Sequence, residues 1–232
     1  MIVESNLPRI RALALEAETV LDVGGWHRPL HAATHVLDLQ PYGTRNTREA
    51  LDPEQPPRYD ASTWFRHDAC KTPWPFPDKF FAFSFCSHLL EDVRDPLAVC
   101  AELCRVSRAG YIETPSRARE IFSKARFFGL KSLLGRMPEV GFYHHRWFVE
   151  IEGDHVRFRA KDQRLLMSRS RFITRHDLGR KMTERESGTF LFWCDRFTCE
   201  ERFDVDEAEL ESFRRRTLDA LKRAGVSFRA SG

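Results

Sequence analysis

The chain has 232 residues, of which 42% are hydrophobic and 19 are phenylalanine, and this composition excludes an intrinsically disordered protein. A net charge of +3 excludes a general polycationic coat for nucleic acid. No apolar run approaches the roughly 20 residues that a membrane-spanning helix needs, and the first residues lack the pattern of a secretory leader. We therefore expect a cytoplasmic protein with reduced cysteines, and their spacing predicts no metal site.

Residues 1–115 alternate between short apolar runs and helical patterns, which is typical of an α/β fold with a mostly parallel sheet. Buried strands are predicted at 19–23, 35–39, 64–68, 79–86 and 111–114. Helices are predicted over 7–18 and from Pro96 to a stop at Gly110, with Asp95 as the N-cap. Right-handed crossovers place the carboxyl ends of such strands at one edge, where open α/β sheets bind ligands.

Three predicted strands end in residues that suit a nucleotide. Asp22-Val23-Gly24-Gly25 ends the first strand, and its glycines allow a ligand to approach the backbone closely. Asp38 ends the second, where nucleotide-binding α/β domains place the carboxylate that binds ribose hydroxyls. Asp68-Ala69 ends the third and could accept a hydrogen bond from an adenine amine. Each could equally be a plain turn, but their order along the chain favours a nucleotide site.

Further residues carry a resemblance to a known family. A Pro75-Phe76 turn, an aromatic strand, the run Ser87-His88-Leu89-Leu90-Glu91 and then Asp95-Pro96 follow one another, and Glu102 to Gly110 continues the pattern. With the three strand ends, this set resembles a class I S-adenosylmethionine-dependent methyltransferase of the small-molecule type, over about the first 115 residues. The resemblance implies a Rossmann-like sheet, S-adenosylmethionine as the cofactor, and methyl transfer to a small molecule.

The resemblance also implies roles for individual residues. Asp22, Gly24 and Gly25 would hold the methionine end of the cofactor. Asp38 and Leu39 would lie at the ribose, and Asp68 and Ala69 would face the adenine. Cys86 and Ser87, after the fourth strand, would flank the methionine moiety, and His88 would stand at the substrate entrance.

The ligand loop departs from the family pattern. Only about eleven residues separate Gly24 from His35, so the first crossover helix is predicted to be shortened or absent. Phe81-Ala82 stands where the family has an aromatic residue followed by an acidic one. Two alternatives to methyl transfer therefore stay open: a non-catalytic binding protein with a degenerate methyltransferase fold, and an enzyme that transfers another group from the sulfonium.

Candidate catalytic and substrate residues lie near the same edge. Methyl transfer to a hydroxyl or ammonium needs a base, whereas a thiolate or carboxylate acceptor needs none. The candidate bases are His88, Glu113, His144 and His145, of which His88 and Glu113 are the best placed in the sequence. His88, His144, His145 and Trp147 are the candidate substrate-binding residues. Each of these side chains could instead form hydrogen bonds that only shape a loop.

The remainder of the chain is predicted to be an elaboration of the sheet. Residues 116–146 are expected to form an inserted lid of helices after the fifth strand. Residues 147–232 are expected to complete the sheet with a hairpin at 147–161 and a strand at 190–203, and to end in a helix at 206–224. The chain contains no nucleic-acid recognition module, so nucleic acid is not expected as a substrate, and the sequence indicates no oligomeric state.

Two basic stretches lie in this second half, at 117–136 and at 164–181. The first interleaves Arg117, Arg119 and other cations with apolar residues. Such a segment could contact an anionic membrane surface or hold an acidic substrate, or it could be a lid with a solvated charged face.

Overall fold

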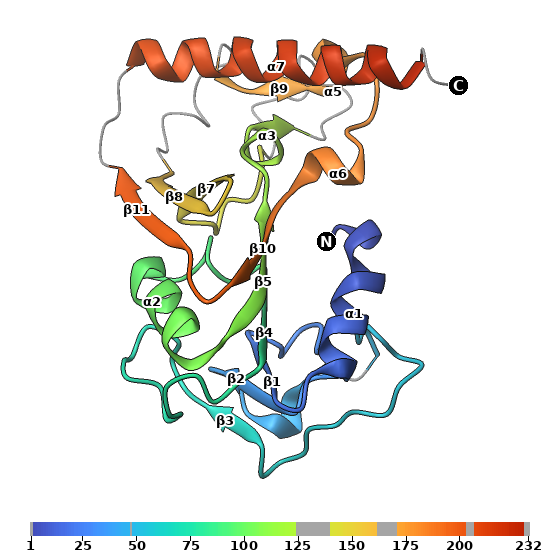
Figure 1. Cartoon of the computed structure of the whole chain (residues 1–232). Coiled ribbons are helices and arrows are strands. Elements are labelled where there is room, and N and C mark those ends of the chain that lie inside the picture. The colour runs from blue at the N-terminus through green and yellow to red at the C-terminus, as the bar shows by residue number, and fades with distance from the viewer. Residues whose placement is uncertain (1, 47, 124–139, 162–170, 203–206, 230–232) are drawn as a thin grey trace.

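The computed structural model describes residues 2–46, 48–123, 140–161, 171–202 and 207–229. Six strands form the main sheet, in the order β10-β5-β4-β1-β2-β3 (Figure 1). They are β1 (Val20–Val23), β2 (His35–Asp38), β3 (Trp64–Arg66), β4 (Phe83–Ser87), β5 (Ala109–Pro115) and β10 (Gly188–Cys194). β1 to β5 run parallel and β10 pairs antiparallel with β5, so the predicted mostly parallel, Rossmann-like sheet is confirmed.

Two helices cover opposite faces of this sheet (Figure 1). α1 (Leu7–Glu16), preceded by the short turn η1 (Glu4–Asn6), buries Ile10 and Ala14 in one core cluster. α2 (Pro96–Val106) buries Val99 and Leu103 in the other. The Asp95 carboxylate accepts a hydrogen bond from the Ala98 amide at 3.0 Å, so it caps α2 as the sequence predicts.

Loops replace most of the crossover helices. Residues 24–34, between β1 and β2, contain no helix, which confirms the predicted loss of the first helix. Between β2 and β3 the described residues form only the turn η2 (Tyr42–Thr44). Aromatic side chains from the next loop cover the sheet instead: the Phe76 ring lies 4.7 Å from Phe65 and 4.8 Å from Phe81.

The role predicted for Gly110 is wrong. It was expected to end the second helix, but α2 ends at Val106 and Gly110 lies inside β5. A Cβ at this position would stand 2.6 Å from Ser84 Oγ and 2.7 Å from the Trp193 ring. The glycine therefore allows close packing of two strands and does not terminate the helix.

The predicted hairpin forms, but it does not complete the main sheet. β7 (Trp147–Glu152) and β8 (His155–Ala160) turn at Gly153 and join β11 (Thr198–Arg202) in a separate three-stranded sheet. The single strand predicted over 190–203 is wrong, because the chain turns at Asp195, whose φ is +63°. β10 before this turn belongs to the main sheet and β11 after it belongs to the second.

The region beyond β5 is made of short elements under a long helix. They are α3 (Arg117–Glu120), β6 (Phe122–Ser123), β9 (Ile173–Thr174), α5 (Arg175–Leu178), α6 (Glu184–Ser187) and α7 (Glu207–Arg229). α7 crosses over them (Figure 1), and its Phe213 and Leu221 are buried with Phe122 and Ile173 in a third core cluster.

Within the predicted lid over 116–146, the described residues contain one helical turn, α3. Residues 124–139 lie outside the described part of the chain, as do 164–170 of the second basic stretch. None of the helices that the structure describes combines the length and the apolar character needed to cross a membrane.

Candidate functional site

A cavity of about 120 Å³ lies at the carboxyl ends of β1 and β4. Its walls are Ile2, Asp22, Gly24, His27, Arg28, Leu51, Phe85, Ser87 and His88. The structure thus brings together four of the residues selected from the sequence, namely Asp22, Gly24, Ser87 and His88. The cavity wall also includes Arg28, which was not selected from the sequence because it lies in a loop without a recognisable pattern. Arg28 makes no ion pair with any residue that the structure describes.

The loop after β1 is held by carboxylates in place of a helix. Gly24, at φ +85°, donates its amide to Leu37 O at 2.9 Å. Asp22 Oδ2 accepts from the Leu30 amide at 2.9 Å, and Asp38 Oδ2 accepts from the Trp26 amide at 3.0 Å. A Cβ on Gly25 would overlap the Asp22 carboxyl, so only glycine fits beside it.

Asp52 completes this loop and was missed by sequence reasoning. It is fully buried, and its two carboxylate oxygens accept from the amides of His31 at 2.6 Å and Ala32 at 2.9 Å. Asp52 lies in a polar, proline-containing loop that is distant in sequence from His31 and Ala32. Neither hydrophobic periodicity nor residue spacing predicts a contact between them.

The Asp22 carboxyl is only 1% exposed. Burial raises its pKa to about 8, against the opposing hydrogen bond from Leu30, and the charges of Asp38 and Asp52 raise it further. At neutral pH Asp22 is therefore largely in its neutral form. A cation placed beside it would favour the ionised form and release the proton.

His88 stands on the other side of the cavity in the left-handed backbone region, at φ +55°. Its Nδ1 lies 3.1 Å from Glu91 Oε1, and its Nε2 lies 3.7 Å from Glu113 Oε1. Burial by itself would lower the pKa of His88, but the two carboxylates outweigh burial and raise the pKa to about 9. The imidazole is therefore a cation at neutral pH.

Glu113 is completely buried beside His88 and interacts with several residues. It accepts hydrogen bonds from the Val3 amide at 2.8 Å and from the Tyr111 hydroxyl, while its own carbonyl accepts from the His88 amide at 2.8 Å. Its carboxylate therefore fixes the position and the charge of His88.

The residues predicted for the nucleoside lie along the same sheet edge, outside the cavity wall. Asp38 Oδ1 accepts from the Gln40 amide at 2.7 Å, and Leu39 beside it is 60% exposed. Asp68 Oδ1 accepts from the Cys70 amide at 2.9 Å, and Ala69 O accepts from the indole of Trp74.

Cys86 was predicted to flank the methionine moiety, and the structure places it elsewhere. It is fully buried in a core cluster and does not line the cavity, and burial raises the pKa of its thiol well above the ordinary value.

The predicted substrate residues of the second half dock against the loop after β4. Trp147 donates its indole N–H to Val93 O at 2.8 Å, and its amide donates to Glu91 O. His145 is buried, with Nδ1 at 2.5 Å from Glu120 Oε1. These contacts hold His145 against Glu120 and Trp147 against the loop after β4, and their role in substrate binding stays a prediction. His144 is exposed, and one donor atom each from His144, His145 and Asp92 lies within 4.8 Å of the others, a spacing that a metal ion could also use.

Comparisons with known proteins find one domain family and several solved structures that this chain resembles. Residues 10–112 match the family model described as a methyltransferase domain. No curated protein matches the sequence.

Among solved structures, an S-adenosylmethionine-dependent methyltransferase from Mesorhizobium loti is 17% identical, with a TM-score of 0.36 over 52% of this chain and 58% of that one. One from Archaeoglobus fulgidus is 15% identical, with a TM-score of 0.34 over 50% of this chain and 53% of that one. The N-terminal domain of EvdMO1 with SAH bound is 17% identical, with a TM-score of 0.34 over 50% of each chain. This chain thus spans about half the length of these structures.

The matched segment contains β1 to β4, α2 and most of the cavity wall, including Asp22, Gly24 and His88. Residues 10–112, somewhat less than half of the chain, are thus similar to a methyltransferase domain.

Proposed function

We propose that this protein transfers a methyl group from S-adenosylmethionine to a small-molecule acceptor. The observation that carries the proposal is the charge pattern of the cavity at β1 and β4. A carboxyl group, from Asp22, and two cations, Arg28 and His88, line one small space. This pattern complements the ammonium and the carboxylate of the methionine end of the cofactor.

The methionine end would bind by charge pairing. The cofactor ammonium would pair with Asp22 and release its proton, while the carboxylate would lie against Arg28 and His88. Gly24 contributes backbone without a side chain, which leaves this space open. The described residues offer Arg28 no carboxylate, so a bound carboxylate would be its first ion pair.

The nucleoside would continue along the sheet edge toward β2 and β3. Asp38 uses each carboxylate oxygen for one backbone hydrogen bond, which leaves lone pairs for ribose hydroxyls. The exposed Leu39 offers an apolar surface to an adenine ring, and Asp68 an acceptor for its amine.

The charge of His88 changes the role expected for it from the sequence. A base must be neutral before it removes a proton, whereas the pKa of about 9 keeps His88 protonated at neutral pH. We therefore assign His88 to binding the carboxylate and Glu113 to positioning His88. An acceptor that reacts as a thiolate or a carboxylate fits this site, because methyl transfer to an anion needs no base.

The cysteines support a reducing, cytoplasmic location as part of the proposal. All six are free thiols, including the exposed Cys194.

The test is turnover measured by mass spectrometry. The protein is incubated with S-adenosylmethionine and panels of small thiols and carboxylic acids, and S-adenosylhomocysteine and the products are quantified. We expect S-adenosylhomocysteine to form together with a product that gains one methyl group, and Asp22→Asn to abolish both. Tight cofactor binding without turnover on any acceptor would favour the non-catalytic alternative. A product that gains another group would establish the second alternative.

A further inference from the structure

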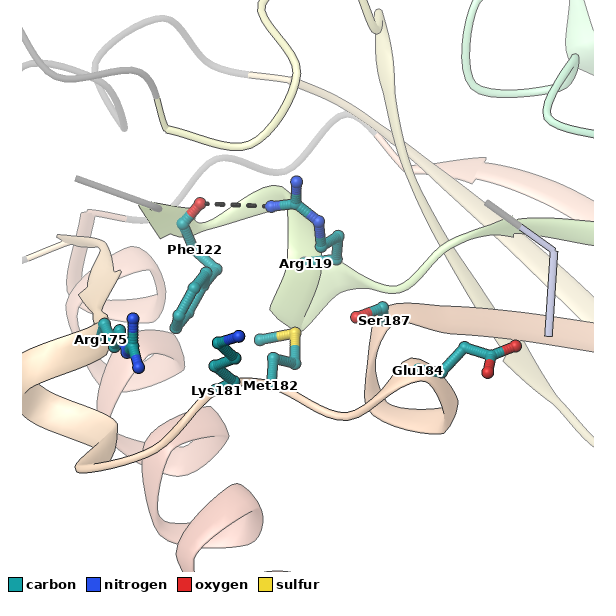
Figure 2. Close-up of a pocket in the computed structure, with 7 residues that line it drawn as sticks. All are labelled: Arg119, Phe122, Arg175, Lys181, Met182, Glu184 and Ser187. Atoms are coloured by element: carbon teal, nitrogen blue, oxygen red, sulfur yellow. Dashed lines mark hydrogen bonds between the residues drawn. The ribbon is translucent and has the colours of Figure 1, made fainter. Parts of the chain in front are cut away.

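A second cavity, of about 310 Å³, lies beyond the carboxyl end of β5, between α3 and the segment from α5 to α6. Its walls are Arg119, Phe122, Arg175, Lys181, Met182, Glu184 and Ser187. Figure 2 shows Lys181 and Met182 facing Arg119 and the Phe122 ring, with Arg175 at one end and Glu184 at the other. None of these residues lines the first cavity, at the carboxyl ends of β1 and β4, which is called the cofactor cavity from here on.

Arg119 is the most unusual member of this wall. It is only 5% exposed, and a guanidinium stays charged in proteins even where, as here, burial lowers its pKa. The one hydrogen bond of its guanidinium among the described residues is a long contact of 3.5 Å to Phe122 O, and the guanidinium lies 4.6 Å from the centre of the Phe142 ring. A buried cation with so little compensation is costly unless an anion joins it.

The charge of Glu120 opposes the effect of burial on Arg119, but no nearby carboxylate forms an ion pair with it among the described residues. Glu120, the next residue, accepts from His145 and Lys161. Asp177 is paired with Arg214, and Glu186 with Arg180. Glu184, within the wall, accepts from the Glu4 amide. In the part of the chain that the structure describes, Arg119, Arg175 and Lys181 thus face one cavity without an ion pair.

The three cations come from the two basic stretches noted in the sequence. Arg119 belongs to the first and Arg175 and Lys181 to the second, and they meet because β6 pairs with β9 at Phe122 and Ile173. Phe122 and Met182 add an apolar surface between them. The cavity therefore offers both positive charge and apolar contact.

We propose that this cavity binds a small amphipathic anion, namely a carboxylate, sulfonate or phosphate group carried on an apolar or aromatic body. The acidic group would pair with Arg119, Arg175 and Lys181, and the body would lie against Phe122 and Met182. The cavity is hollow and Arg119 is buried at its wall, so it suits a small molecule better than a flat membrane surface. The site is separate from the proposed methyltransferase activity.

The test uses a fluorescent anion and its uncharged counterpart. The full-length protein is titrated with 8-anilinonaphthalene-1-sulfonate and, separately, with N-phenyl-1-naphthylamine, which lacks the sulfonate. We expect the anion to bind with a stoichiometry of one, and Lys181→Gln and Arg119→Met to weaken it by about tenfold or more. Arg185→Gln, an exposed neighbour outside the wall, is the matched control and should bind as the wild type does.

Thermal unfolding distinguishes a ligand-binding Arg119 from a structural one. Because Arg119 is a buried cation without an ion pair among the described residues, Arg119→Met should raise or preserve Tm while it weakens anion binding. A lowered Tm in this variant, equal anion affinity in all variants, or no anion binding at all would overturn the proposal. Displacement of the anion by S-adenosylhomocysteine would place the probe in the cofactor cavity and would also overturn it. Failure of S-adenosylhomocysteine itself to bind would count only against the methyltransferase proposal.

Discussion

The buried carboxyl of Asp22 makes the stability of the protein depend on pH. Its folded pKa of about 8 lies above the value in an unfolded chain, so the folded state binds the proton more tightly. The stability linked to this proton is fully present below about pH 4 and is lost as pH rises toward 8. A residue that suits an ammonium ligand thus lowers the stability of the ligand-free protein near neutral pH.

The variant Asp22→Asn removes this ionisation and keeps an acceptor for the Leu30 amide. In the ligand-free protein we expect it to gain on the order of 2 kcal/mol in free energy of unfolding at pH 8, and much less at pH 5. Urea denaturation at the two pH values measures the difference, with Asp219→Asn on the exposed face of α7 as the control. A variant less stable than the wild type at pH 8 would contradict this account of Asp22.

His88 should contribute its charge to ligand affinity only while it is protonated. Affinity for S-adenosylhomocysteine should therefore fall as pH rises through about 9, and His88→Gln should bind about tenfold more weakly at pH 7. The ligand amine titrates equally with both proteins, so the ratio of their affinities isolates His88. Calorimetric titrations from pH 7 to 10 should show this ratio approaching one, and a ratio independent of pH would count against a cationic His88.

At the scale of elements, the strand ends were predictable and the loop between them was not. Apolar runs stopped by glycine or proline located β1 and β2, because a buried parallel strand must be apolar throughout. Asp52 and Arg28 were not predicted as site residues, because their positions depend on the conformation of a loop and no hydrophobic periodicity indicates that conformation. Gly110 was misread because a glycine that allows strands to pack looks, in sequence, like one that ends a helix.

Gly25 tests how tightly the loop after β1 is packed. Its missing Cβ would overlap the Asp22 carboxyl, so Gly25→Ala must displace either that side chain or the loop. We expect a loss of about 2 kcal/mol in stability and at least a tenfold loss in cofactor affinity. Gly43→Ala is the matched control, because no atom lies within 4 Å of its added Cβ. Equal behaviour of the two variants in urea denaturation and calorimetry would refute the packing argument.

At the scale of the whole molecule, a buried charge cluster joins the main sheet region to the second sheet. Glu120, at the end of α3, accepts from His145 at 2.5 Å and from Lys161 at 2.6 Å. Burial opposes its ionisation, but His145 and Lys161 outweigh burial and lower the pKa of Glu120. The stability that it contributes is therefore present above its unfolded pKa and is lost as pH falls through its lowered folded pKa.

Replacing Glu120 by Gln should cost about 3 kcal/mol in free energy of unfolding at pH 7, because Lys161 then stays buried without its counter-charge. Urea denaturation measures the loss, and Glu211→Gln on the exposed side of α7 should leave stability unchanged. A Glu120→Gln variant as stable as the wild type would show that the cluster contributes no net stability.

The second sheet could be predicted only in part from the sequence. The hairpin of β7 and β8 was predictable from its alternation and its glycine turn, but its partner strand was not. Alternation says which face of a strand is buried and gives no information about which sheet it joins. That choice depends on the turn at Asp195, whose positive φ no local signal required.

The binding of S-adenosylhomocysteine tests the central claim most directly. It is measured by calorimetric titration of the wild type and of Asp22→Asn, at pH 7, in two buffers of different ionisation enthalpy. The account predicts that the wild type binds with a stoichiometry of one and releases a proton from Asp22, and that the variant binds at least tenfold more weakly without that proton. No binding to the wild type, or equal binding by the two proteins, would contradict the assignment of this cavity to the methionine end of the cofactor.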